Sequence, residues 1–254
     1  MIFSFLPQLA FVYLLLFARI GAIIMQLPGF GETYVSVRIR LVFALLLTLV
    51  FFPMLNANFA NIPPTLNGVF LLLIQELLIG LFIGASIKLF MSALGIAGTV
   101  ISMQTGLGSA MSFDPTQGSQ APFFSTMLNL AAVTLIFVSD LHHLFFSAMI
   151  DSYTLFPTDG IGFLPIGDFA AMAMDSISKS FYLAMQLSAP FILYGVVFNV
   201  GLGILAKLMP QIQIYFVAMP ANIGIGFVLI MLLFASMILW FLDSFGIMMQ
   251  GFVL

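Results

Sequence analysis

Long stretches without any charged residue constrain this chain more than any other feature. Six of them contain neither an acid nor a base: residues 1–18, 41–75, 89–113, 115–139, 180–206 and 208–242. A transmembrane helix needs about 20 consecutive apolar residues, and every stretch except the first exceeds that length. The sequence therefore predicts an all-α, polytopic membrane protein built from helical hairpins.

The composition supports this class. Of the 254 residues, 63% are hydrophobic and 6% are charged, whereas ordinary globular domains are about 45–50% apolar and about 25% charged. A soluble domain of this size could not bury so much apolar surface, so a bilayer or apolar partner subunits must cover it. The first stretch lacks a basic start and a cleavage site, and we interpret it as a mature span.

Six long helices are expected at about residues 3–27, 39–56, 66–90, 122–150, 176–207 and 212–250. Between the third and fourth lies a stretch rich in glycine and small polar residues, which ends in a breaker-rich loop at residues 112–122. If residues 89–121 enter and leave the membrane on one side, then Arg38, Arg40, Lys88 and Lys207 all share the cytoplasmic face. This arrangement predicts six spans and one re-entrant segment, whose residues 104–122 line or close a pore.

Several classes of function are excluded or disfavoured by residue type. Six Lys and Arg residues cannot form a nucleic-acid footprint, and without cysteine there is no disulfide or thiolate metal site. No metalloprotease or serine-hydrolase motif is present, so no enzyme activity and no cofactor are expected. His142 and His143 are adjacent, point about 100° apart on a helix, and are not expected to chelate one metal ion together.

Glu76, Arg19 and Asp243 lie within expected spans, where an isolated charge is costly. Glu76 is either a proton or ion site, or a structural carboxyl bonded to a polar group of a neighbouring subunit. Lys88 is about 18 Å further along the same helix and cannot be its partner. Arg19 and Asp243 are interpreted as snorkelling or interfacial groups.

Several motifs, taken in order, resemble the FliR family of flagellar and type III secretion export-gate proteins. The N-terminal motifs contain Arg19, Pro28, Gly31, Arg38 and Arg40. The central motifs contain Gly106, Leu107, Gly108, Asp114, Pro115 and Pro122. The C-terminal motifs contain Pro190, Asn199, Gly203, Lys207, Pro210, Gln211 and Pro220. Gln213 departs from the family, which often has asparagine there.

The resemblance implies a fold and a set of partners. Residues 1–175 would form a FliP-like helical half and residues 176–254 a FliQ-like hairpin. The chain would assemble with FliP-like, FliQ-like and FlhB-like subunits in the bacterial inner membrane, partly raised towards the periplasm, within the flagellar basal body. Unfolded export substrates and membrane lipid would be its other partners. The family's central loop closes the channel, which maps here to residues 104–122, with Met103, Met111, Phe113 and Gln117 among the pore-loop residues.

Two hypotheses therefore stand. In the first, the chain is an export-gate subunit whose loop closes the passage, and deleting residues 106–119 should let ions or small solutes leak. In the second, it is a stand-alone secondary transporter or channel that uses Glu76 as its coupling carboxylate.

Overall fold

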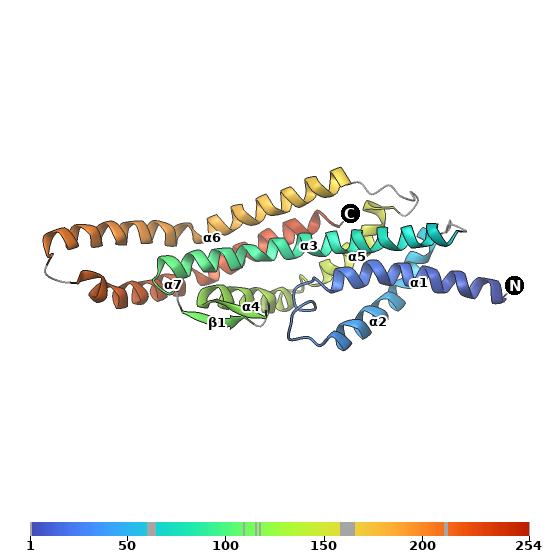
Figure 1. The fold of residues 1–254 in the computed structure, drawn as a ribbon, viewed down its shortest axis with the longest axis horizontal. Helices are drawn as coiled ribbons and strands as arrows, with labels where there is room; N and C mark the ends of the chain where they lie inside the picture. The colour runs from blue at the N-terminus through green and yellow to red at the C-terminus, as the bar shows by residue number, and fades with distance from the viewer. Residues whose placement is uncertain are drawn as a thin grey trace. The chain divides into compact units, whose positions relative to one another are not determined.

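The computed structural model describes residues 2–59, 65–108, 110–114, 116, 118–157, 166–210 and 213–253. Within them the chain forms seven α-helices, a short 3-10 helix and one β-hairpin (Figure 1). The order is α1 (Ile2–Ile24), α2 (Val37–Leu55), η1 (Asn56–Phe59), α3 (Leu66–Gln104), β1 (Met111–Asp114), β2 (Ser119–Pro122), α4 (Phe123–Val138), α5 (His143–Leu155), α6 (Ile166–Leu208) and α7 (Ile214–Gln250). The expected all-α class is confirmed.

Both C-terminal helices that the sequence predicts are present, and their bounds mostly agree with the prediction. Helix α7 starts two residues later than expected, whereas α6 starts ten residues earlier. Both helices continue through an internal proline, Pro190 in α6 and Pro220 in α7. Such prolines are tolerated in membrane helices because neighbouring groups satisfy the freed carbonyls.

Helix α3 is longer than expected, and the prediction that it ends near residue 90 is wrong. The helix contains 39 residues and ends only at Gln104, so Lys88 lies within it and does not mark its end. The small residues that suggested a loop instead permit close packing: a Cβ atom on Gly98 would strike the backbone of Ser125 in α4. Thr99 remains helical because its hydroxyl donates to the Gly95 carbonyl at 2.8 Å.

The expected fourth helix is broken into α4 and α5, whose axes differ in direction by 78°. The break falls in the polar sequence Ser139-Asp140-Leu141-His142. Asp140 adopts a left-handed conformation with φ of 59°, which aspartate tolerates better than most residues and which ends a right-handed helix. A single uninterrupted helix at residues 122–150 is therefore not formed.

Four helices of the described chain are long and apolar enough to cross a membrane. They contain the spans Val37–Leu55, Asn67–Gln104, Phe169–Leu208 and Phe216–Gln250, and a fifth span results if α4 and α5 cross as one broken element. Helix α1 contributes the shorter apolar stretch Gln8–Ile24. By length and composition the described residues therefore contain four or five candidate spans, and the whole of α1 has 23 residues.

The chain divides into two compact units, each of which is described separately. The first unit comprises Met1–Phe90, Ile136–Ile177 and Phe245–Leu254, and its core includes the fully buried side chains of Leu16, Ile20 and Phe145. The second comprises Met91–Leu135 and Ser178–Ser244, with Phe124 and Phe191 in its core. The expected division into residues 1–175 and 176–254 rests on the resemblance and stays a prediction.

Helices α6 and α7 leave large apolar side chains uncovered in the isolated chain. Met231 is 85% exposed, and Phe216 is 75% exposed. Large exposed apolar side chains are typical of helices that meet lipid or another subunit. The inference from composition, that something apolar must cover this chain, is therefore consistent with the structure.

Candidate functional site

The pore loop expected from the sequence contains an antiparallel β-hairpin, formed by β1 and β2 in the second unit. Met111 pairs with Pro122 at its base and Asp114 pairs with Ser119 near its tip. The backbone N–H of Phe123, the first residue of α4, donates to the Ala110 carbonyl at 3.2 Å. The two ends of the hairpin therefore lie side by side, directly before α4.

Gly106 ends α3 and turns the chain towards the hairpin. Its φ of +78° is in the left-handed region, where glycine is strongly favoured. The Leu107 N–H donates to the Ser102 carbonyl at 2.8 Å, and the Gly106 N–H donates to the Met103 carbonyl at 3.3 Å. This pair of bonds is the Schellman motif that closes helix C-termini. A glycine identified from sequence as a pore-loop residue thus defines where the loop begins.

Asp114 anchors the hairpin to α4. The carboxylate is fully buried, and one oxygen accepts from the Thr116 N–H at 2.8 Å and from the Thr116 hydroxyl at 2.6 Å. The other oxygen accepts from the amide nitrogen of Asn129, a buried residue of α4, at 3.2 Å. Because buried carboxylates are stable only when well hydrogen-bonded, this network fixes the position of the hairpin tip.

A second, neutral contact lies nearer the base of the hairpin. The hydroxyl of Ser112 in β1 donates to the hydroxyl of Thr126 in α4 at 3.0 Å. Asn129 and Thr126 lie three residues apart on α4 and therefore face the hairpin together. Neither residue was predicted as a site residue, although both are polar residues within an apolar stretch.

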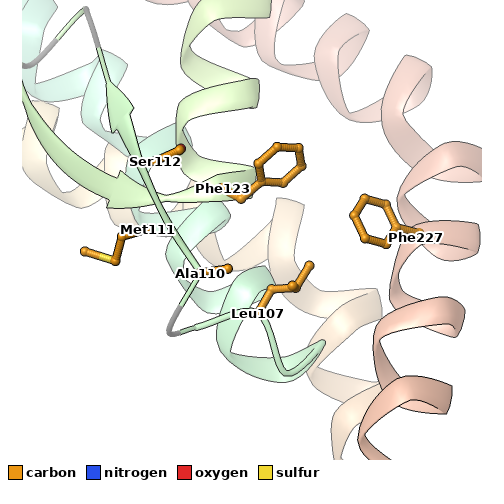
Figure 2. A pocket seen from close by; sticks show the side chains of 6 residues that line it. All are labelled: Leu107, Ala110, Met111, Ser112, Phe123 and Phe227. Carbon is orange, nitrogen blue, oxygen red and sulfur yellow. The ribbon is translucent and has the colours of Figure 1, made fainter.

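A cavity of about 190 Å³ lies beside the hairpin and is lined mostly by apolar side chains. Figure 2 shows the rings of Phe123 and Phe227 facing one another, with Met111 pointing away from them. The two ring centroids are 6.2 Å apart. The lining residues are Leu107, Ala110, Met111, Ser112, Phe123 and Phe227. The hairpin therefore borders an apolar cavity and is also hydrogen-bonded to α4.

Asn222 of α7 ties the end of α3 to both C-terminal helices. Its amide nitrogen donates to the Gln104 carbonyl at 3.3 Å, and its amide oxygen accepts from the Tyr194 hydroxyl of α6 at 2.7 Å. Asn222 was not predicted as a site residue. In the sequence, Asn222 could have been noticed because its amide follows Pro220 in an otherwise apolar stretch.

The remaining pore-loop residues are placed as follows. Met103 lies in the last turn of α3 and is 69% exposed, and Met111 is 52% exposed. Gly108 and Pro122 are half-buried. Pro115 and Gln117 lie outside the described residues, as does the side chain of Phe113.

The two mid-span charges Arg19 and Glu76 form a buried ion pair in the first unit. Both side chains have no exposed surface; the Arg19 Nε lies 2.6 Å from one Glu76 carboxylate oxygen, and Nη2 lies 2.9 Å from the other. Arg19 also donates to the Ser152 carbonyl at 2.8 Å and to the Phe156 carbonyl at 3.2 Å. Its guanidinium lies 4.0 Å from the centre of the Tyr153 ring.

This arrangement corrects two expectations. Glu76 does not depend on a neighbouring subunit, because Arg19 of its own chain binds both carboxylate oxygens. Arg19 is buried and not snorkelling, whereas Asp243 is exposed. A transporter needs a coupling carboxylate that its ion can reach, so a fully paired and buried Glu76 removes the residue on which that hypothesis depended.

The other residues expected to have structural roles are divided between turns and exposed helix faces. Pro28 is buried in the turn after α1, and Arg40 donates to the Val35 carbonyl at 3.1 Å and to the Gly31 carbonyl at 3.3 Å. The following are exposed in the isolated chain: Arg38, Pro190, Asn199, Gly203, Lys207, Pro210 and Pro220. Gln211 lies outside the described residues.

Comparison with known proteins gives one consistent result. The model of the family "Bacterial export proteins, family 1" matches residues 10–248. A flagellar biosynthetic protein FliR from Caulobacter vibrioides is 40% identical over 92% of this chain and 93% of its own length. The FliR proteins of Bacillus subtilis and Escherichia coli are 30% and 27% identical, over 86% and 82% of this chain and 84% and 78% of their own lengths.

Proposed function

The chain belongs to the bacterial export proteins of family 1, and from this membership we propose that it is a core subunit of the flagellar type III export gate. In this role it forms, with FliP-like and FliQ-like subunits, the channel through which unfolded flagellar proteins leave the cytoplasm. An FlhB-like subunit would contact the same assembly. The complex resides in the bacterial inner membrane at the flagellar basal body, with part of its helices raised towards the periplasm.

The uncovered faces of α6 and α7 support an assembled rather than a solitary protein. Side chains such as Phe216 and Met231 are largely exposed in the isolated chain, which is unfavourable in water. In this role residues 176–254 pack against FliQ-like and FliP-like helices, and lipid covers the rest of the apolar surface. Exposed small and breaker residues, such as Gly203, would let partner helices approach closely.

The observation that carries the proposal is the anchored hairpin. Strands β1 and β2 are paired, held to α4 through Asp114 and Ser112, and attached to α3 through the turn at Gly106. A segment that must close a channel needs a defined closed position, which these contacts provide. The segment must also be able to leave that closed position. It borders an apolar cavity of about 190 Å³. We therefore propose that the hairpin closes the export channel.

Excision of the hairpin tests this role without disturbing the flanking helices. Met111 and Pro122 are direct partners, so residues 112–121 can be replaced by two or three glycines that join them. In the assembled gate we expect this variant to leak ions and small solutes into cells or liposomes. A matched control is Gly167→Ala, because nothing lies within 4 Å of the added Cβ and the residue lies outside the segment that we assign to partner contacts. An assembled, tight membrane with the excised variant would contradict closure by the hairpin.

The proposed partners have their own test. The chain should be co-expressed with its FliP-like and FliQ-like neighbours, extracted gently and weighed by native mass spectrometry. A defined hetero-oligomer that contains this chain is expected. A monomer or homodimer, recovered while the neighbours are present but unbound, would contradict the gate assembly independently of the hairpin.

A further inference from the structure

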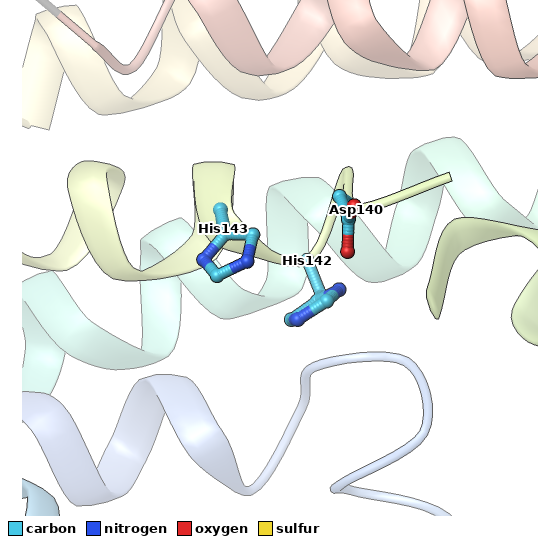
Figure 3. Close-up of side chains that lie close together, drawn as sticks. All are labelled: Asp140, His142 and His143. Atoms are coloured by element: carbon cyan, nitrogen blue, oxygen red, sulfur yellow. The ribbon is translucent and has the colours of Figure 1, made fainter. Parts of the chain in front are cut away.

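The break between α4 and α5 brings together three side chains that carry metal-binding atoms. Asp140, His142 and His143 each offer one donor atom, and these atoms all lie within 4.8 Å of one another. Figure 3 shows the three side chains gathered beside the same turn. Asp140 and His143 are exposed and His142 is half-buried, so the cluster is accessible to an ion.

The geometric reason for expecting that the two histidines cannot share an ion does not hold in this structure. The 100° separation between neighbouring residues describes the directions of their Cα–Cβ bonds, and each imidazole lies beyond two further rotatable bonds. The rings of His142 and His143 converge to a centroid distance of 4.4 Å. The left-handed turn at Asp140, with φ of 59°, places a carboxylate in the same cluster.

Aromatic packing holds one of the imidazoles in position. The His142 ring stacks on Phe137 at 5.3 Å with an angle of 24° between the planes, and Phe146 lies edge-on at 6.4 Å. Its Nδ1 atom is buried and has no hydrogen-bond partner in the described part of the chain. An unsatisfied buried nitrogen is unfavourable, and a coordinate bond would give it a partner.

We propose that Asp140, His142 and His143 bind one divalent transition-metal ion of the zinc class. Two imidazoles and a carboxylate suit zinc, nickel, cobalt or copper, whereas magnesium and calcium prefer oxygen ligands alone. Donors about 2.1 Å from a tetrahedral zinc ion lie about 3.4 Å apart. Rotation of the exposed Asp140 and His143 side chains brings the donors to that spacing. The bound ion fixes the bend between α4 and α5, and its fourth position is open to water.

The sequence makes this site unusually easy to test. The whole chain contains two histidines and no cysteine, so every imidazole ligand it can offer lies in this cluster. The full-length protein, purified in detergent with a tag that contains no histidine, should bind one Co²⁺ per chain, seen as a visible absorption band. Zn²⁺ should displace the Co²⁺ and abolish the band.

Two ligand variants and one control complete the experiment. Asp140→Asn keeps a residue type that tolerates a positive φ, and His143→Ala alters an exposed position, so both variants should fold. Each should weaken Co²⁺ binding at least about tenfold, because even the loss of an outer-shell partner weakens metal affinity by 10- to 100-fold. Asp243→Asn, which removes an exposed carboxylate outside the cluster, should leave it unchanged. Absence of saturable binding, or equal binding by the folded ligand variants, would overturn the proposal.

Discussion

Glu76→Gln should destabilise the protein by about 3–5 kcal/mol, the usual cost of breaking a buried ion pair by removing one partner. Glutamine keeps the size of the side chain but removes its charge, which leaves the Arg19 guanidinium without a counter-ion. Arg19 has no exposed surface, and its other acceptors in the described chain are neutral carbonyls and the Ser152 hydroxyl. An arginine cannot lose its proton at any accessible pH, so the protein has no way to neutralise the stranded charge.

The reverse substitution, Arg19→Met, should behave differently with pH. It strands the Glu76 carboxyl, which can become neutral by taking up a proton. For a carboxyl of ordinary pKa about 4.3, this uptake costs about 3.7 kcal/mol at pH 7 and about 1.6 kcal/mol at pH 5.5. The folded variant then binds one more proton than the unfolded chain, so its stability rises as the pH falls. Between pH 7 and pH 5.5 we expect Arg19→Met to recover about 2 kcal/mol relative to wild type, and Glu76→Gln to recover none.

Unfolding in mixed detergent micelles, followed by circular dichroism at both pH values, measures these differences. Arg38→Met is the matched control for the arginine, because it removes an exposed arginine and should change stability by less than about 0.5 kcal/mol. The double variant Arg19→Met with Glu76→Met should be more stable than the sum of its single losses predicts. If Glu76→Gln were within 1 kcal/mol of wild type, or if both single variants responded alike to acid, the reasoning from a buried pair would be refuted.

Two further substitutions test the second unit. Asp114→Ala removes the acceptor of three hydrogen bonds and leaves the buried Asn129 amide unpaired. The backbone amides of the hairpin should therefore exchange hydrogen faster, and stability should fall by about 1–3 kcal/mol. The control Thr116→Val removes only a hydroxyl contact, and an equal effect of this substitution would contradict the role of Asp114 as the anchor. Gly98→Ala places a Cβ against the Ser125 backbone and should cost about 1–3 kcal/mol. In the control Gly203→Ala the added Cβ lies in open space, so thermal unfolding should show no change or a stabilisation of up to about 1 kcal/mol. Similar losses of stability at both glycines would contradict close packing at Gly98.

The elements that hydropathy alone determines could be predicted from the sequence. The helices expected at residues 39–56 and 212–250 correspond to α2 and α7 within two residues at either end, because a long apolar run has few alternatives to a helix. The end of α3 was placed 14 residues too early. Small polar residues are typical both of loops and of tightly packed helix faces, and the partner at Ser125 that distinguishes the two cases lies in another helix.

The contacts that form the sites depend on distant parts of the chain. Arg19 and Glu76 are 57 residues apart, and each was recognisable as a costly mid-span charge, but only the fold shows that each neutralises the other. Likewise, Asp114 was identified from its motif, whereas its partner Asn129 appears in the sequence only as one amide among apolar residues. The sequence shows a hydrogen-bond donor in one stretch and an acceptor in another. Which donor meets which acceptor follows only from the three-dimensional structure.

The strength of the hairpin's attachment fits the gate role that we propose for it. Among the described residues, two side-chain hydrogen bonds join it to α4: the charged one between Asp114 and Asn129, and the neutral one between Ser112 and Thr126. With about 1.5–3 kcal/mol for the first and about 0.5–1.5 kcal/mol for the second, they favour the closed position by roughly 2–4.5 kcal/mol. That corresponds to roughly 30 to 2,000 closed channels for each open one, a bias that a substrate can reverse with a modest preference for the open state. An apolar core in place of these bonds would hold the hairpin too tightly for such control, which gives a physical reason for a buried carboxylate at this position.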